Sequence, residues 1–339
     1  MRIGLVGFGT GGRIFHLPYI QAASAWELAG VVTRSAERRR ELARDAPGIT
    51  AFDDLDSLID SGVDVVVITT PPETRRELVL QALSRGIHVV ADKPFAPTAG
   101  EARELARAAY EADLLLTVFH NRRWDTDVRT LAEVLESGEL GKIWRAVNRF
   151  DLDEPGSLEV GPAHGLLRDL GSHLVDQSIH LFGPVIRVDG HLDWAGEGEN
   201  RIDAGFSLGL HHLSGTFSQV SASKINQLEG RELTVYAEKG SYTSHMSDVQ
   251  TNQVKAGKHP HSAEEWGIEI EERWGVLRTA AGSRTVPSSA GDYADFYRAL
   301  HDSLSADRPS PVTLEQAVHN LEVLDAARLS DLERRSVEL

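Results

Sequence analysis

The sequence predicts an α/β protein, in which a Rossmann-type, doubly wound parallel sheet is followed by an α+β domain with an antiparallel sheet. Within residues 1–120, short apolar runs alternate with helical segments, the pattern of parallel βαβ units. Beyond residue 121, segments with period-two alternation mostly follow one another without intervening helices, which indicates antiparallel pairing. A glycine-rich turn also lies between the first predicted strand and the first helix.

The length of the chain predicts two domains. A chain of 339 residues exceeds one ordinary hydrophobic core, and the change of pattern separates a domain at 1–120 from one at 121–339. In the first we expect strands at 2–6, 26–33, 65–69, 88–91 and 114–118, and helices at 11–23, 36–45, 73–85 and 98–112. In the second we expect strands at 143–151, 185–193, 202–211, 215–223 and 232–237, a helix at 165–182, closing helices at 291–304 and 313–330, and no assignment for 249–290.

The composition narrows the class of protein. A net charge of −16, from 35 basic and 51 acidic residues, argues against a nucleic-acid surface and against binding to anionic membranes. The absence of cysteine excludes disulfides, thiolate metal sites and cysteine nucleophiles. Apolar runs fall far short of the roughly 20 residues that span a bilayer, and glycines interrupt the N-terminal one, which favours a strand over a signal peptide. We expect a cytoplasmic enzyme with a small-molecule substrate.

The turn after the first strand has the spacing Gly7-x-Gly9-x-x-Gly12, with Thr10 inside it. Between a strand and a helix, the first glycine permits the tight turn and the second lets the backbone approach phosphates, while the third lets the helix pack on the strand. The free N–H groups at the start of the following helix suit an anion. The pattern therefore predicts a site for the pyrophosphate of a dinucleotide.

The end of the second strand predicts NADP(H) rather than NAD(H). Folds that bind NAD usually place an acidic residue there to hold the ribose 2′-hydroxyl, whereas this chain has Thr33-Arg34-Ser35. Thr33 and Ser35 can donate hydrogen bonds to a 2′-phosphate, Arg34 can stack on adenine, and Arg34 or Arg38 can pair with the phosphate. The arginines that follow Arg38 fit better as a solvated helix face.

A lysine follows the strand predicted at 88–91. In Asp92-Lys93-Pro94, Lys93 lies at the carboxyl edge of a parallel strand, where ligands of this fold bind. Hydride transfer to or from a carbinol carbon needs a group that handles the hydroxyl proton and polarises the carbonyl. A lysine beside a cationic nicotinamide can do both, and a surface lysine without chemistry is the open alternative.

The helix predicted at 165–182 carries ionisable residues on one face. His173, Asp176 and His180 are related by i, i+3 and i+7, and Asp169 extends the stripe. Burying four such groups is costly without a purpose. Three interpretations remain open: Asp176 and His180 hold and protonate a substrate hydroxyl, the stripe binds a metal although no HExxH element supports it, or it is solvated or hydrogen-bonded to neighbouring strands.

These motifs resemble the Gfo/Idh/MocA family, whose name joins glucose–fructose oxidoreductase, inositol dehydrogenase and rhizopine catabolism. The resemblance covers nearly the whole chain and rests on Gly7–Gly12 with His16 and Pro18, Thr70-Pro71-Pro72, Gly86-Ile87-His88-Val89, Asp92-Lys93-Pro94 and the run from Gly171 to Gln177. A narrower match is to the NADP-dependent scyllo-inositol dehydrogenase-like branch, through the run from Val118 to Asp125, the aspartate at 92 and the run from Glu271 to Gly275.

The resemblance implies a Rossmann domain, a second domain with a large open antiparallel sheet, and oxidation of a sugar or cyclic polyol hydroxyl or the reverse reduction. Its catalytic residues match Lys93 and His180, which would handle the proton, and Asp176, which would orient the reacting oxygen. It further implies a homodimer or homotetramer through the open sheet. The remaining candidates are Thr70, Pro71 and Lys93 for the cofactor and His173, Asn121, Arg123 and Trp124 for the substrate.

Two departures limit what the resemblance carries. The family usually has Asn after Thr70-Pro71 and His three residues later, where this chain has Pro72 and Arg75. The turn at Gly240-Ser241-Tyr242 lacks the Lys-Tyr-Gly stretch that follows it in the narrower branch. We therefore expect an NADP-dependent oxidoreductase that acts on a secondary hydroxyl or ketone of a sugar or cyclitol, with its substrate unnamed. The alternative is a catalytically silent, NADP(H)-binding regulator.

Overall fold

The computed structural model describes residues 1–158, 161, 164–261, 265–306 and 308–339. The chain forms two compact units. The first comprises Met1–His120, Tyr293–Val318 and a short stretch that begins at Gly257. The second comprises Asn121–Ala256, Glu265–Asp292 and His319–Leu339. None of the helices in these described ranges combines the length and the apolar character needed to cross a bilayer.

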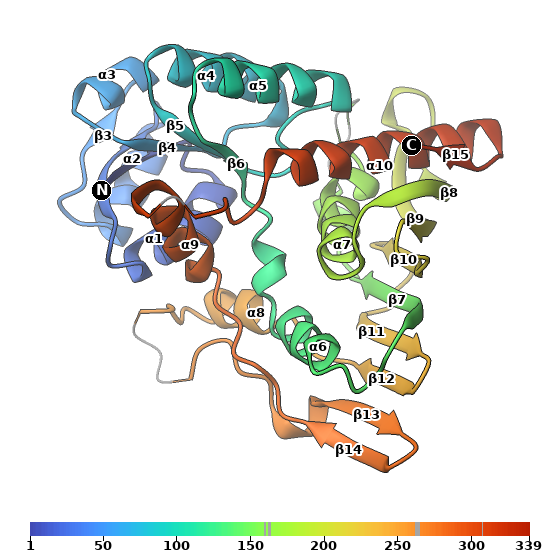
Figure 1. Cartoon of the computed structure of the whole chain (residues 1–339). Coiled ribbons are helices and arrows are strands. Elements are labelled where there is room, and N and C mark those ends of the chain that lie inside the picture. Colours follow the sequence, from blue (N-terminus) through green and yellow to red (C-terminus); the bar gives the residue numbers. More distant parts are fainter. Residues whose placement is uncertain (159–160, 162–163, 262–264, 307) are drawn as a thin grey trace. The chain divides into compact units, whose positions relative to one another are not determined.

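The first unit is built on a parallel sheet with the strand order β3-β2-β1-β4-β5-β6. Figure 1 labels β3, β4, β5 and β6 of this sheet. This order is that of the Rossmann fold, so the predicted class is confirmed. The strand β4, near the middle of this order, is buried on both faces, as its continuous β-branched run predicts. The strands are β1 (Arg2–Val6), β2 (Glu27–Val32), β3 (Ala51–Phe52), β4 (Val65–Ile68), β5 (His88–Ala91) and β6 (Leu116–Val118).

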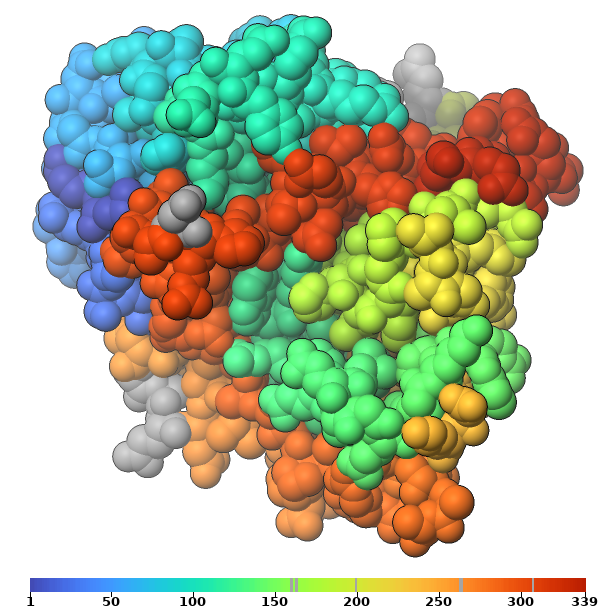
Figure 2. All heavy atoms as spheres, in the orientation of Figure 1, coloured from blue at the N-terminus to red at the C-terminus, as the bar shows by residue number. Residues whose placement is uncertain are grey.

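Helices of the first unit begin where the sequence provides caps. Side chains of Ser35, Asp54 and Thr98 each accept a hydrogen bond from a backbone N–H in the first turn. The helix predicted at 11–23 is instead a π-helical turn, η1 (Gly11–His16), followed by α1 (Leu17–Ala22). The others are α2 (Ala36–Asp45), α3 (Leu55–Asp60), α4 (Pro72–Ser84), α5 (Ala99–Glu111) and α9 (Ala294–Ser305). In the space-filling view, α4 and α5 form one continuous surface, coloured cyan to teal (Figure 2).

The second unit is built on a nine-stranded sheet with the order β14-β13-β12-β11-β7-β10-β9-β8-β15. Its neighbouring strands are antiparallel except for β7 and β10, which confirms a large, mostly antiparallel sheet. The parallel pair arises because a helix and two more strands separate β7 from β10. The strands are β7 (Ile143–Asp151), β8 (Val185–Ala195), β9 (Ile202–His212), β10 (Phe217–Ser223), β11 (Gly230–Ala237), β12 (Gly240–Ser244), β13 (Gly275–Thr279), β14 (Gly282–Val286) and β15 (Val337–Glu338).

One face of this sheet is covered by helices. The helix α7 (Leu166–Phe182) is almost entirely buried and packs on β9 and β10 (Figure 1). The helix α6 (Thr126–Glu136) contributes Leu131 and Val134 to a core that includes Tyr242 and Leu277 of β12 and β13. The remaining helices are α8 (Val249–Lys255) and α10 (Leu314–Glu333). The other face carries exposed side chains such as Tyr236, over whose ring Arg145 lies.

Sequence patterns missed several elements. The helix α6, the hairpins around β12, β13 and β14, and the short β3, α3, α8 and β15 have no counterpart among the predicted elements. The short β4 and β5 were found because they are continuous apolar runs, whereas β12, β13 and β14 mix polar and apolar residues and are too short to show a clear period. Asp54, which caps α3, is a signal that could have revealed that helix.

A buried charge cluster links the start of α6 to the sheet. The Arg231 guanidinium on β11 contacts the carboxylates of Asp125 and Asp127, with N–O distances of 2.6 Å to each. It also lies 5.0 Å from the centre of the Phe150 ring. All four residues are buried. Burial raises the pKa of Asp127, and the nearby Asp125 charge adds to this effect, so the carboxylate depends on Arg231 to remain charged.

We predict that Arg231→Met lowers the free energy of unfolding by about 3–5 kcal/mol at neutral pH, because the buried carboxylates lose the positive charge that Arg231 provides. At pH 5, below the raised Asp127 pKa of about 6, the deficit relative to the wild type should be smaller, since protonation removes the buried charge and the folded variant binds protons more tightly than the unfolded chain. Chemical denaturation at both pH values measures this. Arg145→Met, on the exposed face, is the matched control. A deficit that grows on acidification would contradict the prediction.

Candidate active site

The glycine turn after β1 has the geometry that a dinucleotide requires. Gly7 has a φ of 100°, which side chains disfavour. A Cβ on Gly12 would lie 2.4 Å from the Gly7 carbonyl oxygen, whereas a Cβ on Gly9 would meet nothing within 4 Å. The Thr69 hydroxyl donates to the Gly7 carbonyl at 3.1 Å and holds the turn. The fold thus requires Gly7 and Gly12. Gly9 leaves open space, with the exposed Thr10 next to it, where a pyrophosphate fits.

The end of β2 presents polar groups that are partly engaged by the protein. The Ser35 hydroxyl accepts the Arg38 amide at 3.3 Å, and Thr33 is buried. The Arg34 Nε donates to the Asp53 carbonyl at 3.0 Å, so its guanidinium is held beside the strand end. Arg38 pairs with Glu41 at 2.7 Å. The sequence interpretation did not foresee that Asp53 and Glu41 hold these arginines.

The turn Asp92-Lys93-Pro94, called here the lysine turn, lies close to the glycine turn (Gly7–Gly12) within the first unit. Lys93 lies two residues after the end of the buried β5, and its peptide bond to Pro94 is cis. The Asp92 Oδ1 accepts the Lys93 amide at 2.8 Å. A Cβ on Gly11 would lie 3.0 Å from the Asp92 Oδ2, so the carboxylate of one turn touches the backbone of the other. The Lys93 amide is thus bonded to a carboxylate that lies close to the glycine turn.

Asp92 is held as a carboxylate. Burial favours its neutral form, but contact with His16 and the charges of Arg75 and Lys93 outweigh burial and lower its pKa to about 2. The His16 Nε2 lies 3.7 Å from the Asp92 Oδ1, and the His16 Nδ1 lies 2.5 Å from the Tyr297 hydroxyl. His16 and Tyr297 are fully buried. The part played by Tyr297 was missed, because no local pattern connects α9 with η1.

The helix α7 carries the second group of candidates. Asp176 is buried, and both its oxygens accept hydrogen bonds from Arg123, one from Nε at 2.8 Å and one from Nη2 at 2.7 Å. His173 is buried and His180 is exposed on the same helix. Partial desolvation and the Arg123 charge lower the pKa of His180, and Asp176 only partly offsets them. The lowered pKa of His180 favours its neutral form, which can accept a proton.

The short 3₁₀ helix η2 (Asn121–Trp124) supplies the predicted substrate residues. The Gln177 side chain on α7 donates to the Arg122 carbonyl at 3.1 Å, which holds η2 against the helix. Asn121 is buried, and Trp124 is half-buried with its carbonyl bonded to Gln250. Arg123 thus contacts Asp176 directly, a pairing that the sequence did not indicate. Within the described ranges, no group of three or more His, Asp or Glu side chains is placed to hold a metal ion.

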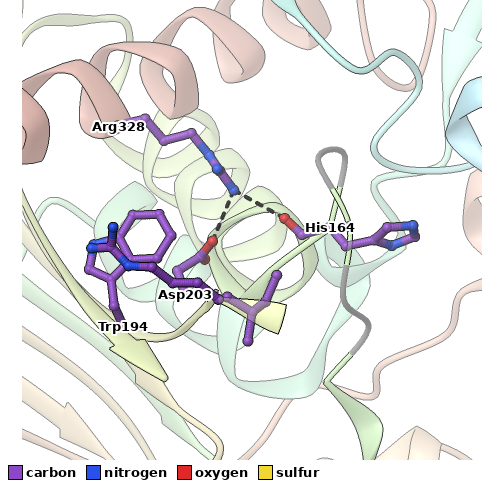
Figure 3. Close-up of a pocket in the computed structure, with 7 residues that line it drawn as sticks. His164, Trp194, Asp203 and Arg328 are labelled. Carbon is purple, nitrogen blue, oxygen red and sulfur yellow. Dashed lines mark hydrogen bonds and ion pairs between the residues drawn. The ribbon is translucent and has the colours of Figure 1, made fainter. Parts of the chain in front are cut away.

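A pocket of about 430 Å³ in the second unit lies apart from these candidates. Arg328 donates to the Asp203 carboxylate at 3.0 Å and to the His164 carbonyl at 3.1 Å (Figure 3). None of the candidate residues lines it, and its arginines already have protein partners, so it is not the candidate active site. Its lining consists of Gly161, His164, Trp194, Arg201, Ile202, Asp203 and Arg328.

Comparisons with known proteins agree with this organisation. The family model for the NAD-binding Rossmann fold of the Gfo/Idh/MocA oxidoreductases matches residues 1–120, and that for the C-terminal alpha/beta domain matches residues 132–339. Scyllo-inositol 2-dehydrogenase (NADP(+)) IolW of Bacillus subtilis is 30% identical over 353 residues, covering 100% of this chain and 96% of that protein.

Two further proteins are similar to this chain, one over about half of its length and one over all of it. Inositol 2-dehydrogenase of Mycolicibacterium gilvum is 32% identical over 192 residues, covering 55% of this chain and 53% of that protein. The solved structure of the putative oxidoreductase yvaA from Bacillus subtilis superposes with a TM-score of 0.91 at 29% identity, covering 100% of this chain and 99% of that one.

The Rossmann unit with its glycine and lysine turns, together with these relatives, defines an NAD(P)-dependent dehydrogenase. The chain belongs to the Gfo/Idh/MocA oxidoreductase family, as its motifs predicted. In this chain, Lys93 lies in the first unit, and Asp176 and His180 lie in the second.

We predict opposite shifts of the His180 pKa in two variants. Arg123→Gln should raise it, because a nearby positive charge is lost, and Asp176→Asn should lower it, because a negative charge is lost. NMR titration of the imidazole measures both without any substrate, and His180→Gln assigns the resonance. Shifts in the same direction in the two variants would show that the Arg123–Asp176 pair does not control His180.

Proposed function

We propose that the protein transfers a hydride between NADP(H) and a secondary hydroxyl or ketone of a sugar or cyclitol. The observation that carries the proposal is the contact between the lysine turn and the glycine turn at one edge of the parallel sheet. It supports the proposal that Lys93 handles the proton near the expected dinucleotide, as oxidation of a carbinol requires. The full-length relative named as an NADP-dependent scyllo-inositol 2-dehydrogenase supports the cyclitol class.

In the proposed mechanism, Lys93 and His180 handle the hydroxyl proton. A nicotinamide held at the glycine turn would supply the hydride chemistry that interconverts the carbinol and the ketone. A neutral His180 can take up the hydroxyl proton during oxidation and return it during reduction, while Lys93 donates a hydrogen bond to the reacting oxygen. Asp176 is proposed to orient the reacting oxygen through Arg123, which donates hydrogen bonds to both oxygens of the Asp176 carboxylate.

Residues of η2 and α7 are proposed to recognise the substrate. Asn121 and His173 offer hydrogen-bonding groups for a polyol, Trp124 offers an aromatic face, and Arg123 is proposed as a further substrate residue. Thr70 and Pro71, which follow β4, are proposed to line the nicotinamide side of the cofactor. We further propose that the protein is cytoplasmic, binds no nucleic acid, and forms a homodimer or homotetramer through the sheet face that carries Tyr236.

The preference for NADP(H) is proposed from the end of β2. Arg34 is held near the strand end by the Asp53 carbonyl, and Thr33 and Ser35 flank it. A guanidinium and two hydroxyls suit a 2′-phosphate, and Arg38 can turn from Glu41 to join them.

The function is tested by supplying cyclitols, aldoses and keto-sugars with NADP(H) and following the absorbance of NADPH in both directions. We expect turnover of at least one cyclitol or sugar. Lys93→Ala should lower kcat by about two to four orders of magnitude, because an acid–base group is lost, with NADP(H) affinity retained. Lys239→Ala, in the second unit, is the control. Wild-type turnover in Lys93→Ala would remove the lysine from the mechanism, and no turnover of any compound would favour a silent NADP(H)-binding regulator.

The cofactor preference is tested by titrating NADP and NAD against the wild type and two variants. We expect tighter binding of NADP, and a loss of about 1.5–3 kcal/mol in Arg34→Ala, the value of a hydrogen bond between charged groups, for NADP but not for NAD. Arg40→Ala, on the exposed face of α2, should change neither. Equal dissociation constants for NADP and NAD in the wild type would refute the preference.

A further inference from the structure

Arg75 is a buried arginine that none of the proposed roles uses. It lies in the first turn of α4, immediately after the Thr70-Pro71 loop, and only 4% of it is exposed. Burial lowers the pKa of its guanidinium, and the Asp92 charge opposes that effect. Burying a guanidinium is costly unless its N–H groups are hydrogen-bonded. The contacts that compensate this cost show what the side chain does.

The Arg75 guanidinium joins two loops through three carbonyl groups. Its Nε donates to the Thr70 carbonyl at 2.7 Å, and its Nη1 donates to the Asp92 carbonyl at 2.6 Å and to the Pro94 carbonyl. Asp92 and Pro94 are the two neighbours of Lys93 in the chain. The lysine is therefore anchored on both sides, and the anchor also holds the loop after β4.

These contacts begin where the strand ladder ends. The parallel pairing of β4 with β5 stops at Ile68 and Ala91, and the Asp92 amide makes the last bond, to the Ile68 carbonyl at 2.9 Å. Beyond it the two chains are no longer paired as strands. The planar fork of arginine can reach carbonyls of both loops at once, whereas the single ammonium of lysine or an amide side chain cannot reproduce this geometry.

The Arg75 guanidinium also lies near the carboxylate of Asp92. The Arg75 Nη2 lies 3.9 Å from the Asp92 Oδ2, while His16 approaches the Oδ1. The backbone and side chain before Lys93 are thus both oriented by buried groups. Because Asp92 also touches Gly11, the same set of contacts fixes the lysine turn relative to the glycine turn.

We propose that Arg75 is a positioning residue that sets the direction of Lys93 toward the reacting oxygen by clamping the loops after β4 and β5. This inference rests on the proposed function, in which Lys93 handles the proton. Arg75 touches neither substrate nor reacting atoms in this role. It acts through the backbone on either side of the lysine.

The test compares Arg75→Gln and Arg75→Lys with the control Arg76→Gln. Arg76 is the next residue on α4, is 43% exposed in its side chain and pairs with Glu104 on the surface. Two readouts are used: kcat with its KM values, and the rate at which acetic anhydride acetylates Lys93, followed by mass spectrometry. The second needs no substrate, so it reports on the lysine even if no sugar is turned over.

We expect both Arg75 variants to lose about 10- to 100-fold in kcat, the cost of a misplaced catalytic group, with a much smaller change in KM for NADP(H). The acetylation rate of Lys93 should change in the same variants, and Arg76→Gln should match the wild type in both readouts. Arg75→Lys keeps the charge, so its failure to restore kcat would assign the effect to the fork geometry.

Three results would overturn the proposal. One is a folded Arg75→Lys protein with the wild-type kcat and acetylation rate. Another is an acetylation rate that is unchanged in both variants while kcat falls, which would separate Arg75 from Lys93. The third is loss of folding in both variants, seen by circular dichroism, which would make Arg75 a determinant of the fold. Failure of the proposed function would appear instead as wild-type protein without turnover and with an acetylation rate that still responds to Arg75.

Discussion

Parallel pairing of β1, β4 and β5 is the constraint on which the candidate site depends. Because these strands run in one direction, the residues that follow them emerge at one edge of the sheet. The Thr69 amide bonds to the Val6 carbonyl and the Asp92 amide to the Ile68 carbonyl, each at 2.9 Å, so the three strands end in step. The glycine turn and Lys93 meet there through Asp92 and Gly11. A chain with the same motifs on unpaired loops would not bring them together.

Buried arginines in each of the two units have partners of matching geometry. Arg75 is satisfied by carbonyls, Arg123 by both oxygens of Asp176, and Arg231 by Asp125 and Asp127. In a low-dielectric interior, a charge without such partners costs several kcal/mol, whereas a complete set of hydrogen bonds offsets most of that cost. These pairs add little net stability, and their value lies in holding loops and helices in one arrangement.

The sequence predicted the elements whose residues carry a local signal. The strands β5 and β7 occupy the predicted ranges, and α7 begins one residue after its predicted start. The two-residue β3 was missed because of its length, and β12, β13 and β14 were missed because they lack the continuous apolar run that reveals the still shorter β5. The helix 11–23 was predicted as one element, yet it divides into a π-helical turn and an α-helix at His16, whose ring bonds to Tyr297 on a distant helix.

The sequence by itself determined the Rossmann class, the glycine turn and the place of Lys93, because apolar period, glycine spacing and position after a strand are local properties. Only the tertiary structure decided which side chains act together. His16 meets Tyr297 across 281 positions, and Arg123 meets Asp176 across 53. The role of Arg75 belongs to the same category, since its carbonyl partners lie in two loops that the parallel sheet brings side by side. A linear pattern records the period of each segment, whereas partners are chosen by packing.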